Sequence, residues 1–267
     1  MSTRRGRHVD MELGRVRLVD ATLVGGDVTV AAHPSASRIE AEVLHGPPLS
    51  VRVTDGTVRI RHRRRWPFPL PTRTARASVV VFVPPDTTTR VRSVSAEVLV
   101  SGTHGAVEVR SVAGSLTLTA VSGTVVARNV SGDVDAEDVT GRLSIRSVSG
   151  DVTASGALDT VDARSVSGTV TLDLAAAGVV KVRSVSGDVS VRLPEPAALA
   201  VRARTASGRF DSAFRLDGGD ARDQRLSGRI TNPTGRGKGA ITVKTVSGDV
   251  ALLRREERPE PPEAEAV

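Results

Sequence analysis

Residues 146–152 read Arg-Ser-Val-Ser-Gly-Asp-Val, and residues 183–189 repeat the same seven letters. Variants of this motif fill the second half of the chain. Its glycine returns every 18 to 21 residues, at Gly114, Gly132, Gly150, Gly168, Gly187, Gly208, Gly228 and Gly248. Ala96 holds the same place one interval earlier. A fixed period of this length is the signature of a repeat architecture.

Aliphatic residues keep step with this glycine on both sides. Those that come two residues before it are Val94, Val112, Val130, Val148, Val166, Val185, Leu226 and Val246, with Ala206 among them. Those that come two residues after it are Val98, Leu116, Val134, Val152, Val170, Val189, Phe210, Ile230 and Val250. This alternation predicts β-strands that turn their aliphatic side chains to one face.

We predict an all-β, single-stranded β-solenoid (β-helix) of about nine coils, with an irregular N-terminal β cap. One coil cannot bury its own apolar face, whereas a stack of coils can, each strand pairing with the same strand of the next coil along the chain. A narrow interior suits valine, alanine and leucine, and only 2% of the residues are aromatic. An antiparallel sandwich would also alternate, but it does not require the same residues at the same places in every strand.

The chain divides into four predicted regions. Residues 1–9 are expected to be disordered, and residues 10–90 to form a β cap that is continuous with the solenoid. Residues 91–253 form the repeats. Residues 254–267 hold prolines and glutamates and are expected to be a disordered acidic tail.

The residues that carry the repeat resemble those of the bacterial putative-adhesin family of β-strand-repeat domains of unknown function. The resemblance rests on the Arg-Ser-Val-Ser-Gly-Asp-Val series and covers about residues 26–252. It implies a single-stranded β-solenoid, and some members of the family occur with cell-envelope stress systems. The family offers no catalytic motif to transfer.

A basic segment is the sharpest local feature, and we take it as a candidate site for binding an anionic surface. Residues 59–76 hold seven arginines and no acid, and the net charge of the whole chain is +7. Arginines near an anionic leaflet attract it, and aromatic side chains can anchor at its interface. The alternative is a solvated loop whose aromatic residues cover the open end of the rod. The candidate residues are Arg59, Arg61, Arg63, Arg64, Arg65, Trp66, Phe68, Arg73 and Arg76.

A second basic feature follows the repeat. Stacking would align Arg92, Arg110, Arg128, Arg146, Arg164, Arg183 and Arg204 along one edge. They could form a positive stripe for an anionic polymer. We favour instead their pairing with Asp133, Asp151, Asp188 and similar acids on neighbouring turns, which avoids crowding of like charges.

The sequence supplies no catalytic, cofactor or metal-binding constellation. The five histidines are scattered, the chain has no cysteine, and no nucleophile motif is present. The acidic run at residues 133–138 lacks the glycines of calcium-binding β-rolls. We therefore expect no enzyme, no cofactor and no metal.

The leading hypothesis is a non-catalytic binding or scaffold module at the inner face of the cell envelope. No secretory signal or apolar span is evident, so we expect a cytoplasmic protein that is peripheral to the inner membrane. Expected partners are an unidentified protein and an anionic membrane, and nucleic acid is not favoured. Two alternatives stay open: a self-associating, filament-forming solenoid, and a carbohydrate-active β-helix enzyme.

Overall fold

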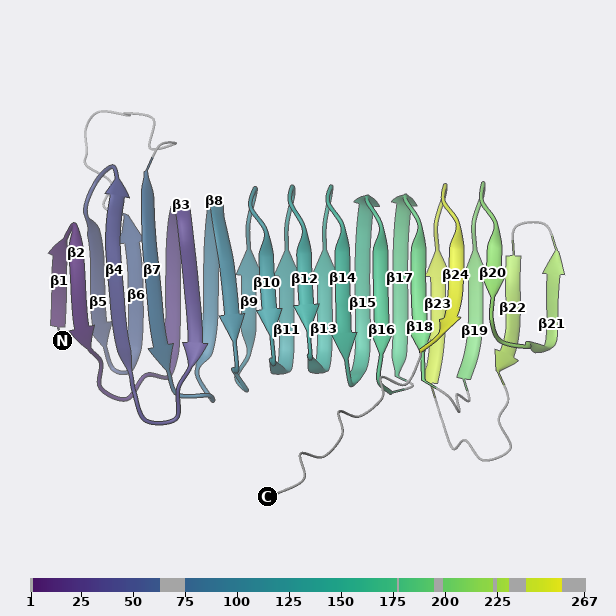
Figure 1. Ribbon diagram of the computed structural model, residues 1–267, viewed down its shortest axis with the longest axis horizontal. Coiled ribbons are helices and arrows are strands. Elements are labelled where there is room, and N and C mark those ends of the chain that lie inside the picture. The colour runs from purple at the N-terminus through teal and green to yellow at the C-terminus, as the bar shows by residue number, and fades with distance from the viewer. Residues whose placement is uncertain are drawn as a thin grey trace, which may run out of the picture.

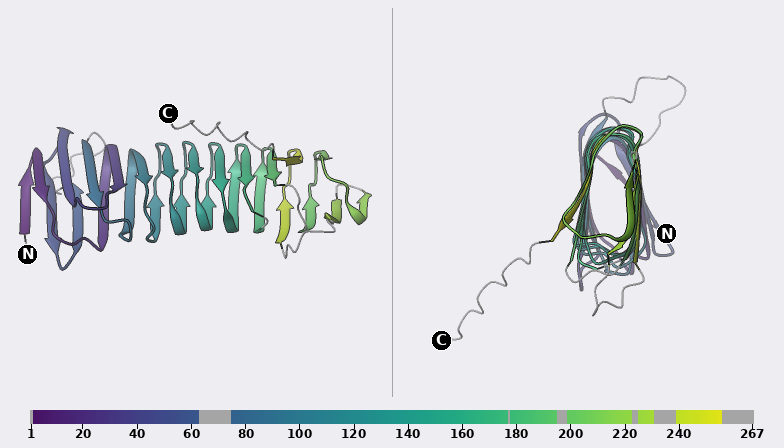
Figure 2. Two further views of the ribbon diagram at one scale, coloured as in Figure 1. Left: turned by 60° about the horizontal axis from the view of Figure 1, so that its bottom comes forward. Right: turned by 90° about the vertical axis from the view of Figure 1, so that its right-hand side faces the viewer.

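The computed structural model is a flattened rod built from β-strands (Figure 1). It describes residues 2–62, 75–176, 178–194, 199–222, 225–230 and 239–255. Viewed along its length, the rod is a narrow ring with two long walls and two short edges (Figure 2). No helix in the described residues is long and apolar enough to cross a membrane.

The described residues of the N-terminal third form seven strands. They are β1 (Ser2–Gly6), β2 (His8–Glu12), β3 (Leu18–Ala32), β4 (Arg38–His45), β5 (Leu49–Thr54), β6 (Thr57–His62) and β7 (Arg76–Val83). Strands β6 and β7 pair with β3 in parallel, each along a different half of it. Farther out, β5 pairs with β6, β1 with β5, β4 with β7 and β2 with β4, all antiparallel. The predicted irregular β region at residues 10–90 therefore shares its hydrogen bonding with the rod.

Parallel coils follow from β8 onward. Their strands are β8 (Thr88–Ser101), β9 (Val107–Arg110), β10 (Leu116–Thr119), β11 (Ser122–Arg128), β12 (Val134–Glu137), β13 (Thr140–Arg146), β14 (Val152–Gly156), β15 (Leu158–Ser167), β16 (Val170–Leu174), β17 (Val179–Ser186) and β18 (Val189–Leu193). The C-terminal strands are β19 (Leu199–Arg204), β20 (Phe210–Ser212), β21 (Asp217–Arg222), β22 (Arg225–Ile230), β23 (Gly239–Lys244) and β24 (Val250–Arg254).

Each coil contributes one strand to each wall. The first wall contains β9, β11, β13, β15, β17, β23 and β19, and the second contains β10, β12, β14, β16, β18, β24 and β20. The long strands β3 and β8 run through both walls. The short edge between a first-wall strand and the next second-wall strand, at the top of Figure 1, holds the Ser-Gly motif, and we call it the corner. This arrangement confirms a parallel β-solenoid.

The core is a stack of aliphatic side chains between the two walls. In the second wall Leu116, Val134, Val152, Val170, Val189 and Val250 occupy one register position, and each is at most 1% exposed. Burying such a side chain fully contributes about 1.5 to 3 kcal/mol. The alternation predicted from the sequence therefore places these residues correctly.

The glycine of the repeat is required by close backbone packing at the corner. Gly132 has a φ of +104°, a region that L-residues rarely adopt. A Cβ atom added to it would lie 2.7 Å from the carbonyl oxygen of Gly114 in the preceding coil. Gly150 and Gly168 have the same conformation and press on the glycine of the coil before them. At these three positions the coils can therefore stack closely only because the residue lacks a side chain.

Polar side chains complete the corner on both sides of the glycine. The serine three residues before the glycine is buried, and its hydroxyl donates to a nearby carbonyl: Ser147 Oγ lies 3.3 Å from Ser149 O. The aspartate after the glycine accepts a backbone N–H from the next coil, as Asp133 Oδ1 does from Asp151 N at 2.9 Å. These bonds satisfy backbone groups that the turn leaves without strand partners.

The valines that come two residues before the glycine do not share the buried face. Val112, Val130 and Val148 are 51%, 45% and 46% exposed. The expectation that the aliphatic residues on both sides of the glycine turn to one face is wrong at this position. The chain bends around the buried serine at the corner, so the strand alternation that holds within each wall does not carry across it.

The order of the last coils also differs from the sequential order that we predicted. Strands β23 and β24 insert between β17 and β19 in the first wall and between β18 and β20 in the second (Figure 1). Gly248 therefore stacks on Gly187, and Gly208 stacks on Gly248. Gly228 lies in β22, which pairs antiparallel with β19, so it is not a corner glycine.

Both ends of the chain are predicted from the sequence to be disordered. Residues 1–9 do not match the predicted disorder, because β1 pairs with β5 and the first residues of β2 pair with β4. The predicted disordered tail lies outside the described residues from residue 256 onward.

The corner glycine should tolerate no side chain. We expect Gly132→Ala to lower the free energy of unfolding by about 1 to 3 kcal/mol, because alanine is strained at this φ and its methyl group meets the neighbouring coil. Chemical denaturation followed by circular dichroism measures the loss. Gly14→Ala is the matched control, since nothing lies within 4 Å of a Cβ at Gly14. Equal stability of the two variants would contradict the close packing.

Disulfide trapping should show that the coil of β23 and β24 lies between its two neighbours. The chain has no cysteine of its own, so only introduced pairs can form a disulfide. Ser247 forms bridges with both Ser186 and Ser207, so cysteine pairs at 186/247 and at 207/247 should oxidise readily. A pair at 186/207 is two coils apart and exceeds the Cα separation of about 7 Å beyond which a disulfide cannot form. Ready oxidation of the 186/207 pair alone would support sequential stacking instead.

Candidate functional site

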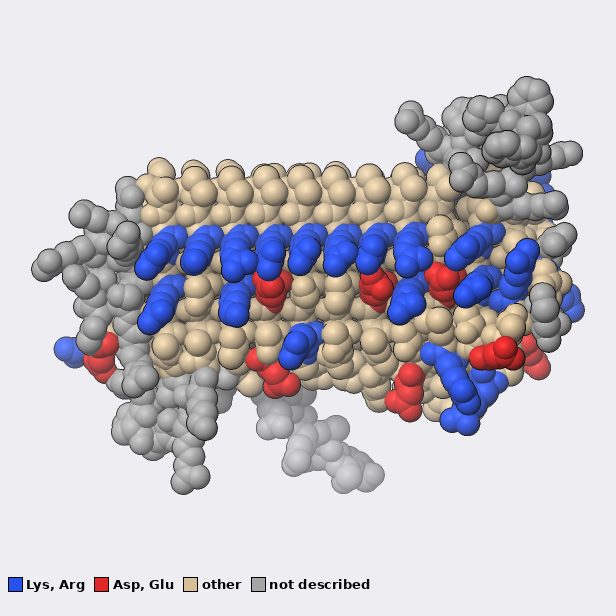
Figure 3. Space-filling model, turned by 180° about the vertical axis from the view of Figure 1, so that it is seen from behind, with Lys and Arg blue, Asp and Glu red and all other residues tan. Residues whose placement is uncertain are grey.

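A row of basic side chains runs along the first wall, beside the corner. It contains, in spatial order, Arg92, Arg110, Arg128, Arg146, Arg164, Arg183, Lys244 and Arg204, which we call the cation ladder. Each residue is the register partner of the next, so neighbouring Cα atoms lie about 4.8 Å apart. Figure 3 shows the ladder as an unbroken blue row along one face. The insertion of β23 places Lys244 between Arg183 and Arg204.

Three acids contact the ladder. Asp20 lies 3.6 Å from Arg92, Glu108 forms an ion pair with Arg110, and Asp162 lies 3.1 Å from Arg164. The side-chain hydrogen bond from Arg164 lowers the pKa of Asp162 below its usual 3.8, with further help from the charges of Arg164 and Arg183. Eight cations and three acids leave five positive charges along this row.

The other rungs lie outside ion-pair distance of every acid that the structure describes. Among the described residues, no carboxylate lies within 4 Å of the charged groups of Arg128, Arg146, Arg183, Lys244 or Arg204. The predicted pairing of these arginines with Asp133, Asp151 and Asp188 is therefore wrong. Those aspartates lie beyond the corner and accept backbone N–H groups of the next coil.

The structure describes only part of the predicted basic segment. Arg59 and Arg61 lie on β6, where they contact the buried carboxylate of Asp20 at 3.8 and 3.1 Å. Arg76 begins β7. Arg61 pairs in register with Thr22, as Arg92 does, so β6 continues the line of the ladder. The candidate residues Arg63, Arg64, Arg65, Trp66, Phe68 and Arg73 lie outside the described residues.

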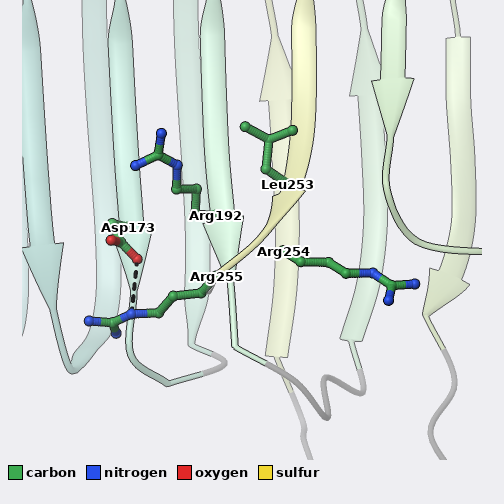
Figure 4. Close-up of a pocket in the computed structure, with 5 residues that line it drawn as sticks. All are labelled: Asp173, Arg192, Leu253, Arg254 and Arg255. Atoms are coloured by element: carbon green, nitrogen blue, oxygen red, sulfur yellow. Dashed lines mark ion pairs between the residues drawn. The ribbon is translucent and has the colours of Figure 1, made fainter. Parts of the chain in front are cut away.

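A pocket of about 430 Å³ near the end of β24 is lined by three arginines. Their side chains point in different directions (Figure 4). Arg255 pairs with Asp173 at 3.3 Å. Arg254 turns away from Asp173 and donates to Ala213 O at 3.2 Å. Arg192 alone of the three arginines here has no such contact among the described residues. This pocket therefore presents less free positive charge than the ladder.

The described residues hold no group of three histidine, aspartate or glutamate side chains that could bind a metal ion. Asp135 lies in the acidic run at residues 133–138. Its pKa is raised by burial and by the neighbouring charges of Asp133 and Glu137.

Comparison with known proteins yields a family and several distant structures. The model of a family described as "Toastrack DUF4097" matches residues 25–253. No curated protein matches the chain.

The similar solved structures include two that are titled as adhesion proteins and one as a lipid-binding protein. A "putative adhesin" from Bacteroides fragilis is 11% identical, with a TM-score of 0.41, covering 94% of this chain and 97% of that chain. A "putative cell adhesion protein" from Clostridium sporogenes is 10% identical, with a TM-score of 0.33, covering 95% and 100%. A "putative lipid binding protein" from Parabacteroides distasonis is 8% identical, with a TM-score of 0.30, covering 94% and 98%.

The pKa of Asp162 should depend on its contact with Arg164 of the cation ladder. Because its pKa is lowered by Arg164, Asp162 stays ionised to lower pH than an isolated aspartate, and its stabilising effect is lost as the pH falls through the lowered value. Arg164→Gln should raise this pKa toward 3.8, as measured by NMR of the side-chain carboxyl carbons. Asp135, whose raised pKa does not depend on Arg164, is the internal control. An unchanged Asp162 would contradict the contact.

Proposed function

The chain belongs to the Toastrack DUF4097 family, and we propose that it is a non-catalytic binding module whose cation ladder contacts an anionic surface. The family match confirms the resemblance carried by the Arg-Ser-Val-Ser-Gly-Asp-Val repeat. The candidate site is therefore no longer the basic segment alone. It is the cation ladder, a longer row of residues whose line continues to β6.

The observation that carries this proposal is the run of ladder rungs without acidic partners. Like charges that lie directly opposite each other on neighbouring strands destabilise a sheet. The fold stacks eight cations in this way, and three of them contact an acid. An anionic partner would offset the repulsion along the ladder, so charge favours such a partner at this face.

The shape of the ladder favours an extended partner. Seven intervals of about 4.8 Å give a straight row of about 34 Å. The rungs are fixed to a continuous hydrogen-bonded wall, so they cannot converge on one small anion. A surface or polymer with many negative groups can contact all of them at once.

The location and the partners are part of the same proposal. We place the module at the inner face of the cell envelope, as a cytoplasmic protein peripheral to the inner membrane. The proposal includes an unidentified protein partner, and the family resemblance supports an association with envelope stress. The antiparallel strands β1, β2, β4 and β5 would act as the cap that protects the N-terminal end of the rod.

Replacing the ladder arginines that have no acidic partner among the described residues should strongly weaken binding to anionic vesicles. In the variant with Arg128, Arg146, Arg183 and Arg204 changed to glutamine, each lost charge removes about 1 kcal/mol near an anionic leaflet. We expect affinity for phosphatidylglycerol-containing vesicles at low salt to fall by two to three orders of magnitude. Vesicle flotation measures this fall, and added salt should weaken wild-type binding.

A matched control variant has the same net charge as the variant of the ladder. Changing Arg15, Arg52, Arg192 and Arg215 to glutamine removes four exposed arginines outside the ladder. This variant should retain most of the binding. If both variants lose affinity equally, net charge and not the ladder is responsible. Wild-type protein that fails to float at low salt would contradict the proposal outright.

A further inference from the structure

An exposed row of valines runs beside the cation ladder at the corner. Its members are Val94, Val112, Val130, Val148, Val166, Val185 and Val246, which we call the valine strip. They are 45% to 55% exposed. Seven of the ten exposed large apolar side chains among the described residues belong to this strip, so these exposed side chains are concentrated and not scattered. Contiguous apolar patches on a protein surface mark interaction sites.

Backbone hydrogen bonds hold the strip in line. The carbonyl of Val112 accepts from Ser131 N at 2.9 Å, and that of Val130 accepts from Ser149 N at 2.8 Å. The last coils continue the pattern: the carbonyl of Val185 accepts from Ser247 N at 2.9 Å. The seven valines are separated by six intervals of about 4.8 Å, so the strip is about 29 Å long.

Each valine lies next to a cation. In the coil of Val148, the sequence Arg146-Ser147-Val148 places an exposed arginine and an exposed valine on either side of a buried serine. The same arrangement in successive coils makes the cation ladder and the valine strip two parallel rows. The corner is a short, convex edge of the rod (Figure 2), and the exposed valines lie along it.

We propose that the valine strip enters the interfacial region of an anionic lipid bilayer while the cation ladder binds the headgroups. This inference rests on the proposed function and names its partner. Arginine stems can lie along apolar surface while their charged ends reach the phosphate level. An apolar row beside a basic row is the pattern by which surface-bound segments lie in a bilayer interface.

Other partners fit the two rows less well. A second copy of this chain would bring a second cation ladder close to the first, and the charges would repel. Single-stranded nucleic acid is bound by a basic groove with aromatic side chains on which bases stack. The two described rows contain arginine, lysine and valine alone, and the valine strip follows a convex edge.

A fluorescent probe can locate the strip relative to the bilayer. Because the chain lacks cysteine, Val148→Cys can be labelled with an environment-sensitive dye, and Thr153→Cys on the outer face of the second wall is the matched control. With phosphatidylglycerol-containing vesicles, we expect lipid-borne quenchers to reach the dye at position 148 and iodide to lose access to it. The dye at position 153 should stay open to iodide.

The outcomes separate this inference from the proposed function. If the protein binds the vesicles and both dyes stay in water, the ladder binds the surface but the strip does not enter it, and the inference is wrong. If the protein binds single-stranded nucleic acid and no vesicles, the partner is wrong although the ladder binds an anion. Binding of neither overturns both proposals.

Substitution of the strip gives a second readout. Changing Val130, Val148 and Val166 to serine should weaken binding to anionic vesicles by at least about tenfold, since their apolar area no longer gains from leaving water. The unfolding midpoint should stay close to that of wild type, because these side chains are about half exposed in the free protein. Unchanged vesicle affinity would contradict the inference.

Discussion

The rod depends on one contact, the approach of each corner glycine to the backbone of the coil before it. At Gly132 a side chain would collide with the carbonyl oxygen of Gly114, and the φ of +104° excludes most other residues. The contact fixes how one coil lies on the next. Because it recurs at the same place in each coil, it also fixes what lies above and below every other residue.

This repeated alignment divides the corner into an internal and an external part. Buried serine hydroxyls on the inside and exposed aspartate carboxylates at the turn surface bond to the backbone groups of the turn, so these polar residues are structural. Outside, the same alignment stacks one basic side chain and one valine in successive coils. The folded rod therefore carries two unfavourable terms, which are the repulsion among the stacked cations and the exposure of the valines to water. A negatively charged, partly apolar partner would offset both.

Much of the fold could be predicted from the repeat, because strand alternation and the glycine interval report local geometry. The order of the coils could not, since every coil carries the same pattern and the sequence does not show that β23 lies between β17 and β19. The exposure of Val112 was missed because alternation within a strand does not continue around the corner. The sequence predicts that the arginines pair with Asp133 and Asp151 on neighbouring turns, but the corner directs those acids to the backbone.

The basic segment at residues 59–76 and the cation ladder differ in how a sequence reveals them. The segment is a local run of arginines, which composition shows directly. The ladder gathers residues from β8 to β23, and its charge is evident only when the coils are stacked. The most direct test of the account is the vesicle affinity of three single variants, Arg128→Gln, Arg146→Gln and Arg183→Gln. A continuous ladder predicts similar losses of about fivefold for each. A loss confined to one rung, or no loss at any, would contradict it.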